Sequence, residues 1–246
     1  MTTSYGESAD RPTPKRSTAL WFALAATTAI LAWIAVDLWG SRSTDIRSFD
    51  PNAVGRLETA MWRSYYDREK LRLFSQLAEL MRAQYRFPFL RSNVAAYQAA
   101  RAAFVFKDGF NRADYEKALP NLVRFYAAIR RVSNSSFDAE RAARLELEWW
   151  MIHRERTSHR PVDLERALAD LPAAVYGVPV ERLMEHARLR AGAMLTRDAK
   201  AEAGGLTEED WARIEELLIL SWQSLWNALN SPFTPTPNQK GDSIEK

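Results

Sequence analysis

The sequence predicts an all-α protein in which one N-terminal transmembrane helix precedes a globular bundle of about six to seven helices. Three observations lead to this prediction. Residues 18–38 form a long apolar run. Glycine and proline are few, with 9 and 11 in 246 residues, which disfavours a turn-rich β fold. The apolar residues of the central region recur at spacings of three and four, as on one face of a helix.

The composition restricts the kinds of partner and chemistry that we expect. After an anchor and two tails are set aside, the chain is long enough for one domain. Its 34 basic and 31 acidic residues give a net charge of +3 and alternate along the chain, as in Asp67-Arg68-Glu69-Lys70. We therefore expect no nucleic-acid partner, which would need a clustered basic face. The chain has no cysteine, so disulfides and thiolate zinc sites are excluded.

The segment from Thr18 to Leu38 is the predicted anchor, within an anchor region of residues 18–39. Its one charge is Asp37, close to its end. At about 1.5 Å per residue a helix of this length crosses a hydrocarbon core of roughly 30 Å. Trp21 and Trp39 lie where aromatic side chains favour the membrane interface. The lipid bilayer is thus the expected partner of Thr18 to Leu38. A cleaved signal peptide is the alternative, but Leu38-Trp39-Gly40 is a poor cleavage site.

The charges beside the anchor favour a cytoplasmic N-terminus, with the helical domain outside the cytoplasm (periplasmic in a bacterium). Lys15 and Arg16 directly precede the apolar run, whereas Arg42 and Arg47 follow it at a greater distance. Residues 40–49 are then a linker. The tails, residues 1–17 and 231–246, are predicted to be disordered, because they have no periodic apolar pattern.

The first half of the helical domain, residues 50–230, contains three predicted helical segments. Asp50-Pro51 is a favourable N-cap and first-turn pair, and it opens one long helix, or two in series, that ends near Phe87-Pro88. A second helix covers 90–106, and its alanine-rich sequence suggests close packing. The third segment begins after Asn111 and is divided by Pro120 into a short helix and a longer one.

The second half contains four predicted helices joined by short connections, which favour antiparallel neighbours in a bundle. The fourth covers about 138–157 and the fifth 162–175, and the sixth begins at Pro179 and ends before Gly204-Gly205. Thr207 and Asp210 form a capping box that opens the last helix. That helix has the most regular apolar stripe in the chain: Trp211, Ile214, Leu218, Trp222, Leu225 and Leu229.

Two helices carry matched stripes that combine a carboxylate with aromatic residues. At positions i, i+3, i+4 and i+7 these are Glu58, Met61, Trp62 and Tyr65 in one helix and Glu146, Trp149, Trp150 and His153 in another. Glu148 lies in the same apolar run. Buried carboxylates with raised pKa values serve as acids, bases or ligand-binding groups. Glu58, Glu146, Glu148 and His153 are therefore candidate catalytic residues, and Trp62, Tyr65, Trp149 and Trp150 are candidate ligand-binding residues.

A structural interpretation of the same residues stays open. The three carboxylates would then pair with arginines at the edge of the core, such as Arg101, Arg130, Arg141 or Arg144, while Tyr65 and His153 make ordinary hydrogen bonds. No metal or cofactor is expected, because His153, His159 and His186 lack the spacing of a metal-binding helix. No motif of nucleophilic catalysis or phosphate binding is present either.

These patterns predict a membrane-tethered helical domain without catalytic activity, which interacts with a protein partner or associates with itself. The prediction is based on an anchor, a well-formed helical body and no reaction-specific motif. The alternative is a helical domain whose internal, carboxylate-lined pocket binds a small ligand or performs acid–base chemistry. The matched stripes of Glu58 and Glu146 are the reason for this alternative.

Overall fold

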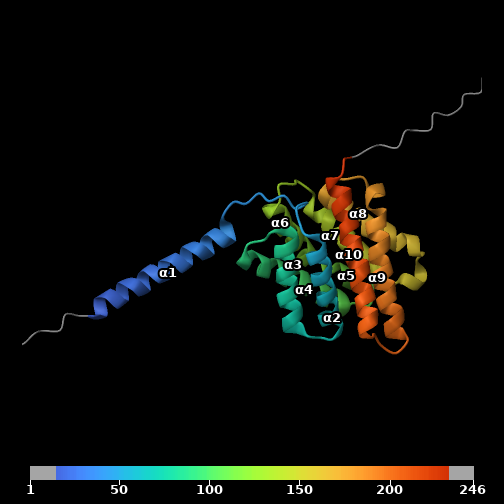
Figure 1. Ribbon diagram of the computed structural model, residues 1–246, viewed down its shortest axis with the longest axis horizontal. Helices are drawn as coiled ribbons and strands as arrows, with labels where there is room; N and C mark the ends of the chain where they lie inside the picture. The colour runs from blue at the N-terminus through green and yellow to red at the C-terminus, as the bar shows by residue number, and fades with distance from the viewer. Residues whose placement is uncertain (1–14, 233–246) are drawn as a thin grey trace, which may run out of the picture. The chain divides into compact units, whose positions relative to one another are not determined.

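The computed structural model describes residues 15–232, which are almost entirely helical and contain no β-strand (Figure 1). The α-helices are α1 (Lys15–Trp39), α2 (Pro51–Tyr66), α3 (Lys70–Tyr85), α4 (Phe89–Lys107), α5 (Arg112–Glu116), α6 (Leu119–Val132), α7 (Ala139–Arg154), α8 (Pro161–Tyr176), α9 (Met184–Glu202) and α10 (Glu208–Asn230). Short 3₁₀ helices, Arg156–Ser158 and Val180–Leu183, precede α8 and α9. The predicted all-α class is confirmed.

Helix α1 forms a compact unit separate from the rest of the chain, which begins at Ser41. Its segment Thr18–Trp39 has 22 residues and a mean hydropathy of 2.0. It is therefore long and apolar enough to cross a membrane, and a signal sequence would also satisfy these criteria. The predicted tails, residues 1–17 and 231–246, lie mostly outside the described part of the chain.

The predicted number of six to seven helices in the globular part is wrong, because residues 41–232 contain nine α-helices. Two segments that each entered this number once are two helices each, a division that their sequences allowed. The first is broken at Asp67-Arg68-Glu69, where Arg68 adopts a positive φ of 62° and the chain reverses between α2 and α3. In the second, α5 ends at Glu116 and Pro120 lies in the first turn of α6, where no backbone donor is needed.

The predicted helix boundaries are confirmed where a side chain or a glycine provides the cap. Asp50 accepts hydrogen bonds from the backbone amides of Asn52 and Ala53 at the start of α2. Thr207 and Asp210 form the expected capping box of α10. Gly177 ends α8 with a positive φ of 65°, a conformation that glycine adopts without a steric cost.

The eight longer helices of the globular unit form a closed ring. Each of α2, α3, α4, α6, α7, α8, α9 and α10 packs against the preceding and following helix in this order, and α10 packs against α2. Figure 1 shows α9, α10 and α2 lying side by side. Short connections make neighbours antiparallel, so α2, α4, α7 and α9 all end on one side of the ring. We call this side the Tyr66 end.

Closure between α2 and α10 depends on Gly55. A Cβ atom at this position would lie 2.8 Å from the Cα atom of Ile219 in α10, closer than packed atoms allow. The missing side chain thus lets the two backbones approach. Asn52 and Gln223 join the same two helices through a side-chain hydrogen bond of 2.7 Å.

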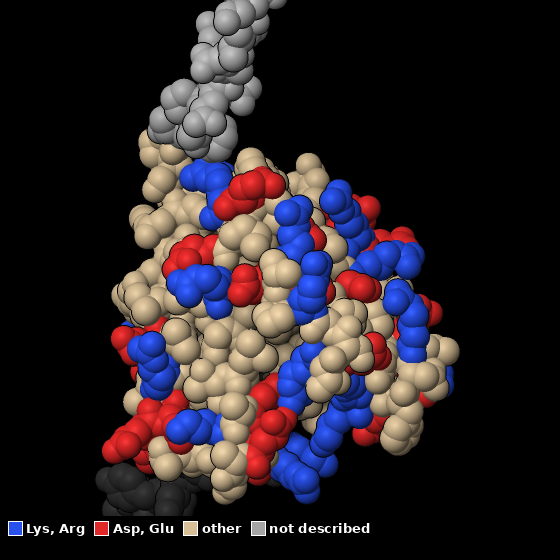
Figure 2. Space-filling model, turned by 90° about the vertical axis from the view of Figure 1, so that its right-hand side faces the viewer, with Lys and Arg blue, Asp and Glu red and all other residues tan. Residues whose placement is uncertain are grey.

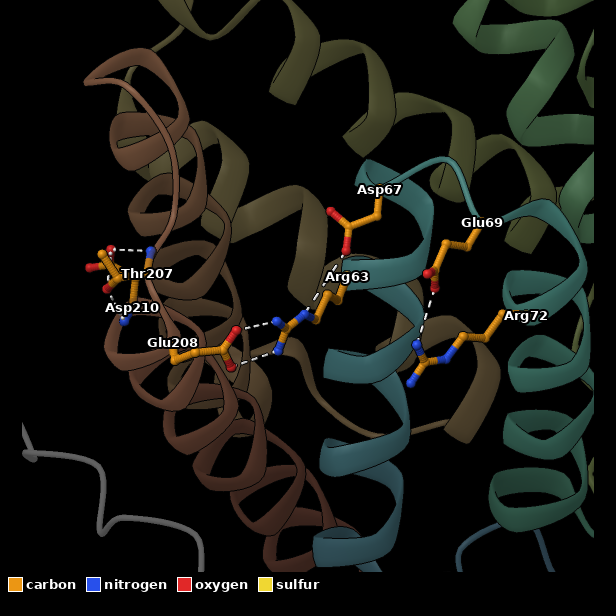
Figure 3. A network of polar contacts seen from close by, with 7 residues as sticks. All are labelled: Arg63, Asp67, Glu69, Arg72, Thr207, Glu208 and Asp210. Atoms are coloured by element: carbon orange, nitrogen blue, oxygen red, sulfur yellow. Dashed lines mark hydrogen bonds and ion pairs between the residues drawn. The ribbon is translucent and has the colours of Figure 1, made fainter.

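Polar contacts also join α2 and α10 at the Tyr66 end. Arg63 of α2 donates hydrogen bonds to both carboxylate oxygens of Glu208, as Figure 3 shows, and lies 3.9 Å from Asp67. Arg63 and Glu208 are substantially exposed, so this pair adds little to stability by itself. It specifies which ends of the helices meet, whereas the buried apolar stripe of α10 provides most of the packing.

The predicted linker, residues 40–49, packs against the globular unit. Ile46 and Phe49 are buried in the core, with 1% and 6% of their surface exposed. The backbone amide of Thr44 donates to the carbonyl of Val132, and Thr44 accepts from the amide of Asn134. The linker thereby covers the ends of helices on the side opposite the Tyr66 end.

Charged residues of both signs are interspersed on the outer surface. Figure 2 shows one face, on which lysine and arginine alternate with aspartate and glutamate and no large patch of one sign occurs. Several charges form pairs within one helix, such as Arg188 with Glu185 and Arg166 with Asp170. This face therefore has the mixed charge distribution of a solvated surface.

The close approach at Gly55 leads to a prediction about stability. Gly55→Ala should lower the free energy of unfolding by roughly 1–3 kcal/mol, because the added methyl group forces α2 away from α10. Thermal unfolding of the full chain, followed by circular dichroism, measures the effect. Gly192→Ala in α9 is the matched control, since its Cβ would meet no atom within 4 Å. The control should be neutral or stabilising by up to about 1 kcal/mol. An equal change in the stability of the two variants would contradict the role of Gly55 in closing the ring.

Candidate functional site

The ring surrounds a cavity of about 540 Å³ that is lined by residues from all eight of its helices. Most of its wall is apolar. Three alanines of α4, Ala99, Ala100 and Ala103, line the cavity, and their small side chains leave space that larger residues would fill. The close packing predicted for this alanine-rich helix is seen at Ala95 and Ala102, which are completely buried.

Both matched stripes line this one cavity. The lining includes Glu58, Met61, Trp62 and Tyr65 of α2 and Glu146, Trp149, Trp150 and His153 of α7. The two helices are not neighbours in the ring, so they contribute to the wall from different sides. Glu148 is not among the lining residues: its side chain is 46% exposed and lies 3.7 Å from Arg112. The candidates thus meet at one place, except for Glu148.

Glu58 is part of a buried charge pair. Its residue is 2% exposed, and its carboxylate accepts a hydrogen bond of 2.8 Å from Nη1 of Arg190 and lies 2.5 Å from Nη2. The indole Nε1 of Trp222 donates to the same carboxylate at 2.6 Å. The cation that pairs with Glu58 is therefore Arg190 of α9, and not one of the four arginines expected from the sequence. With both charges matched, this pair has mainly a structural role.

Glu146 has different surroundings. Its carboxylate accepts a hydrogen bond of 2.8 Å from the Tyr126 hydroxyl and one of 2.9 Å from Nε1 of Trp150. Among the side chains that the structure describes, residues 18–232, no basic group lies within ion-pair distance of it. Burial raises the pKa of Glu146, although the hydrogen bond from Tyr126 and the charge of Arg190 act in the opposite direction. The half-buried carboxylate is thus held by neutral donors on the cavity wall.

At the Tyr66 end the cavity has a charged rim. His153 Nε2 lies 2.8 Å from Oδ2 of Asp198, and Arg197 and Arg156 lie 2.7 and 3.7 Å from the same carboxylate. Burial raises the pKa of Asp198, but the hydrogen bond with His153 and the two guanidinium groups lower it more, so the net shift is downward. Arg197 also stacks on the ring of Tyr66, with its Cζ 3.5 Å from the ring centroid.

The exposed residues of the cavity lining lie at this same end. Of the lining residues, only Tyr66 and Phe104 are exposed, at 37% and 38%, and they stand near the ends of α2 and α4. The opposite end contains the buried side chains of Tyr85 and Tyr176. Gln84 donates to the Tyr176 hydroxyl there at 3.5 Å. A ligand would therefore enter between the helix ends that carry the charged rim.

His186 is a lining residue that the sequence did not single out. Its Nδ1 donates to the backbone carbonyl of Ser221 at 3.0 Å and lies 2.8 Å from the hydroxyl of the same residue. Burial, together with the positive charge of Arg190, lowers the pKa of His186 to about 4. His186 is therefore neutral near pH 7 and adds no charge to the cavity.

The residues that sequence reasoning missed share one face of α9. His186, Arg190, Met194 and Arg197 follow one another at intervals of four, four and three residues, and all four line the cavity. This spacing was a usable signal, because it places two arginines and a histidine on a stripe that also carries a methionine. In residues 15–232 no three His, Asp or Glu side chains are arranged so that they could hold a metal ion.

The chain matches no protein-family model, no curated protein and no solved structure. The arrangement of its own residues is therefore the basis for the function proposed below.

The pair of Glu58 and Arg190 leads to a prediction that separates it from Glu146. Glu58→Gln should lower the free energy of unfolding by about 3–5 kcal/mol, since it leaves the guanidinium group buried without its counter-charge. Glu146→Gln should change stability much less, because Glu146 has no cationic partner. Chemical denaturation of the full chain and both variants measures the difference. A larger loss for Glu146→Gln than for Glu58→Gln would contradict these roles.

Proposed function

We propose that the chain is a membrane-anchored domain that binds a small, largely apolar molecule in the cavity of the helical ring. The observation that carries the proposal is the cavity itself, about 540 Å³ in volume and lined by aromatic and aliphatic side chains with a few polar groups. Ligand sites in proteins typically have this size and composition. The matched stripes of α2 and α7 supply many of the polar and aromatic residues that line the cavity.

A ligand-binding function has a positive observation in its favour, which an assembly function lacks. The assembly function was expected because the sequence has an anchor and no catalytic motif. The cavity instead requires an explanation, since protein interiors are normally packed without large voids. Unfilled space among apolar side chains costs stability. Binding is the proposed function of this space, and assembly with a protein partner is the second candidate.

The proposal includes a location at a membrane. Helix α1 is the anchor, with the N-terminus in the cytoplasm and the globular unit outside it. Lys15 and Arg16 support this orientation. Of the basic residues after the anchor, Arg47 is held within the globular unit, where it donates to the carbonyl of Tyr176 at 2.6 Å. An alkaline phosphatase fused after Asn230 should be active, because this position is outside the cytoplasm in the proposed orientation. If only a reporter that works in the cytoplasm is active when fused at the same position, the orientation is wrong.

Filling the cavity tests the proposed binding. Ala103→Trp, which places an indole in the space beside α4, should lower the affinity for an apolar fluorescent probe at least tenfold. Fluorescence titration of the full chain in nanodiscs measures it, with empty nanodiscs subtracted. Ala212→Trp adds the same side chain at an exposed position of α10 and is the control. If the probe binds the two variants and the unchanged chain equally, the cavity is not the binding site. The assembly function would then be the remaining proposal.

A further inference from the structure

We infer that the ligand of the cavity carries a positively charged amine, and that the Glu146 carboxylate binds this group while the apolar wall holds the rest of the molecule. The inference rests on the proposed binding function and adds the chemical class of the ligand. It depends on three features of the cavity: the balance of charges inside it, the aromatic side chains around Glu146 and the engagement of the arginines at the rim.

Away from the rim, the cavity contains one carboxylate, Glu146, for which no ion pair is found among the described side chains. Glu58 and Arg190 neutralise each other at contact distance. His186 is uncharged near pH 7, because burial lowers its pKa to about 4. Glu146 is the remaining acidic group of the interior, and its hydrogen bonds come from a phenol and an indole. A cation placed beside Glu146 would compensate the cost of burying its charge.

Arg190 does not form an ion pair with Glu146. Its field reaches Glu146 and favours the ionised carboxylate, but no nitrogen of Arg190 lies within 4.0 Å of Glu146. Its guanidinium group makes its contacts with Glu58 instead, below Trp222 and Trp62, at 6.0 and 5.9 Å from their ring centroids. Arg190 is thus the ion-pair partner of Glu58 alone. Glu146 is the carboxylate that a cationic ligand could still pair with.

Aromatic side chains surround the position that an ammonium group beside Glu146 would occupy. Trp149 and Trp150 stand edge to face with centroids 6.0 Å apart, while the Phe106 ring, 5.2 Å from Trp150, already carries the guanidinium group of Arg154 at 4.2 Å. All three line the cavity. The faces of such rings attract cations, most strongly where water is excluded. A carboxylate among aromatic rings suits an amine better than it suits an alcohol or an acid.

Three further arginines that line the cavity, Arg154 and the rim residues Arg156 and Arg197, favour an anionic ligand instead, but each already has other contacts. Arg154 donates to the backbone carbonyls of Phe106 and Gly109 at 2.9 and 3.0 Å. Arg197 and Arg156 both pair with Asp198. These contacts hold the ends of α4, α7 and α9 together. An anionic ligand would compete with them for the guanidinium groups, whereas an amine at Glu146 breaks none.

Three probes of equal chain length test the inference: octylamine, 1-octanol and octanoate. Isothermal titration of the full chain in nanodiscs, with empty nanodiscs subtracted, gives the three affinities. Octylamine should bind at least about tenfold more tightly than octanol, as expected for a charge-assisted hydrogen bond. Octanoate should bind more weakly than octanol. In the Glu146→Gln variant, octylamine should bind no more tightly than octanol does, and the affinity for octanol should be unchanged.

Glu148→Gln is the matched control, because Glu148 belongs to the same helix but lies outside the cavity beside Arg112. It should keep the full preference for the amine. If octanol or octanoate binds the unchanged chain as tightly as octylamine, the inference is wrong while the binding function stands. If none of the three probes binds, the proposed function itself is wrong. The ranking of probes on the unchanged chain decides the inference even if Glu146→Gln fails to fold.

Discussion

The contact between α2 and α10 at Gly55 makes a ring of what would otherwise be an open row of antiparallel helices. Every other pair of neighbours in the ring follows one another along the chain, with only the short α5 between α4 and α6, so local chain geometry favours their packing. Only α2 and α10 must meet from opposite ends of the domain. Their backbones approach where Gly55 lies against Ile219, and the hydrogen bond between Asn52 and Gln223 adds a polar contact one turn away.

Closure of the ring creates an interior that has to hold charged groups. Glu58 of α2 can be buried because Arg190 and Trp222 approach it from α9 and α10, the two helices that closure brings beside α2. The same ring leaves space in its centre, where α4 presents three alanines. Glu146 faces this space with neutral hydrogen-bond partners. The difference between the two carboxylates follows from which helices surround each.

The sequence predicted the local features of the fold better than the distant ones. Caps such as Asp50 and Thr207 and the buried stripe of α10 depend on residues within a few turns, and these predictions are confirmed. The helix count was wrong because two segments were each counted once; in the first, the reversal at Arg68 uses a positive φ at an arginine, which no glycine or proline marks. The matched stripes were visible as spacings. The sequence did not show that both stripes line one cavity, because this depends on closure of the ring.

The partners of the candidate residues were also beyond the reach of sequence patterns. Glu58 and Arg190 are separated by 132 positions, and nothing in the sequence distinguishes Arg190 from the many other arginines. The stripe on α9 that contains Arg190 was a signal, but a helix face with two arginines normally faces solvent. Only the packing of α9 against α10 turns this face inward. Long-range packing thus decided which carboxylate is paired and which is available.

The most direct test of a ligand-binding ring is to locate a bound amine. Crystals of the full chain grown with 8-bromooctylamine would show the bromine by its anomalous scattering. The account predicts a bromine peak enclosed by α3, α4 and α8, with the amine nitrogen about 3 Å from a carboxylate oxygen of Glu146. Bromine peaks confined to the outer surface, or a ring interior filled by side chains, would contradict it.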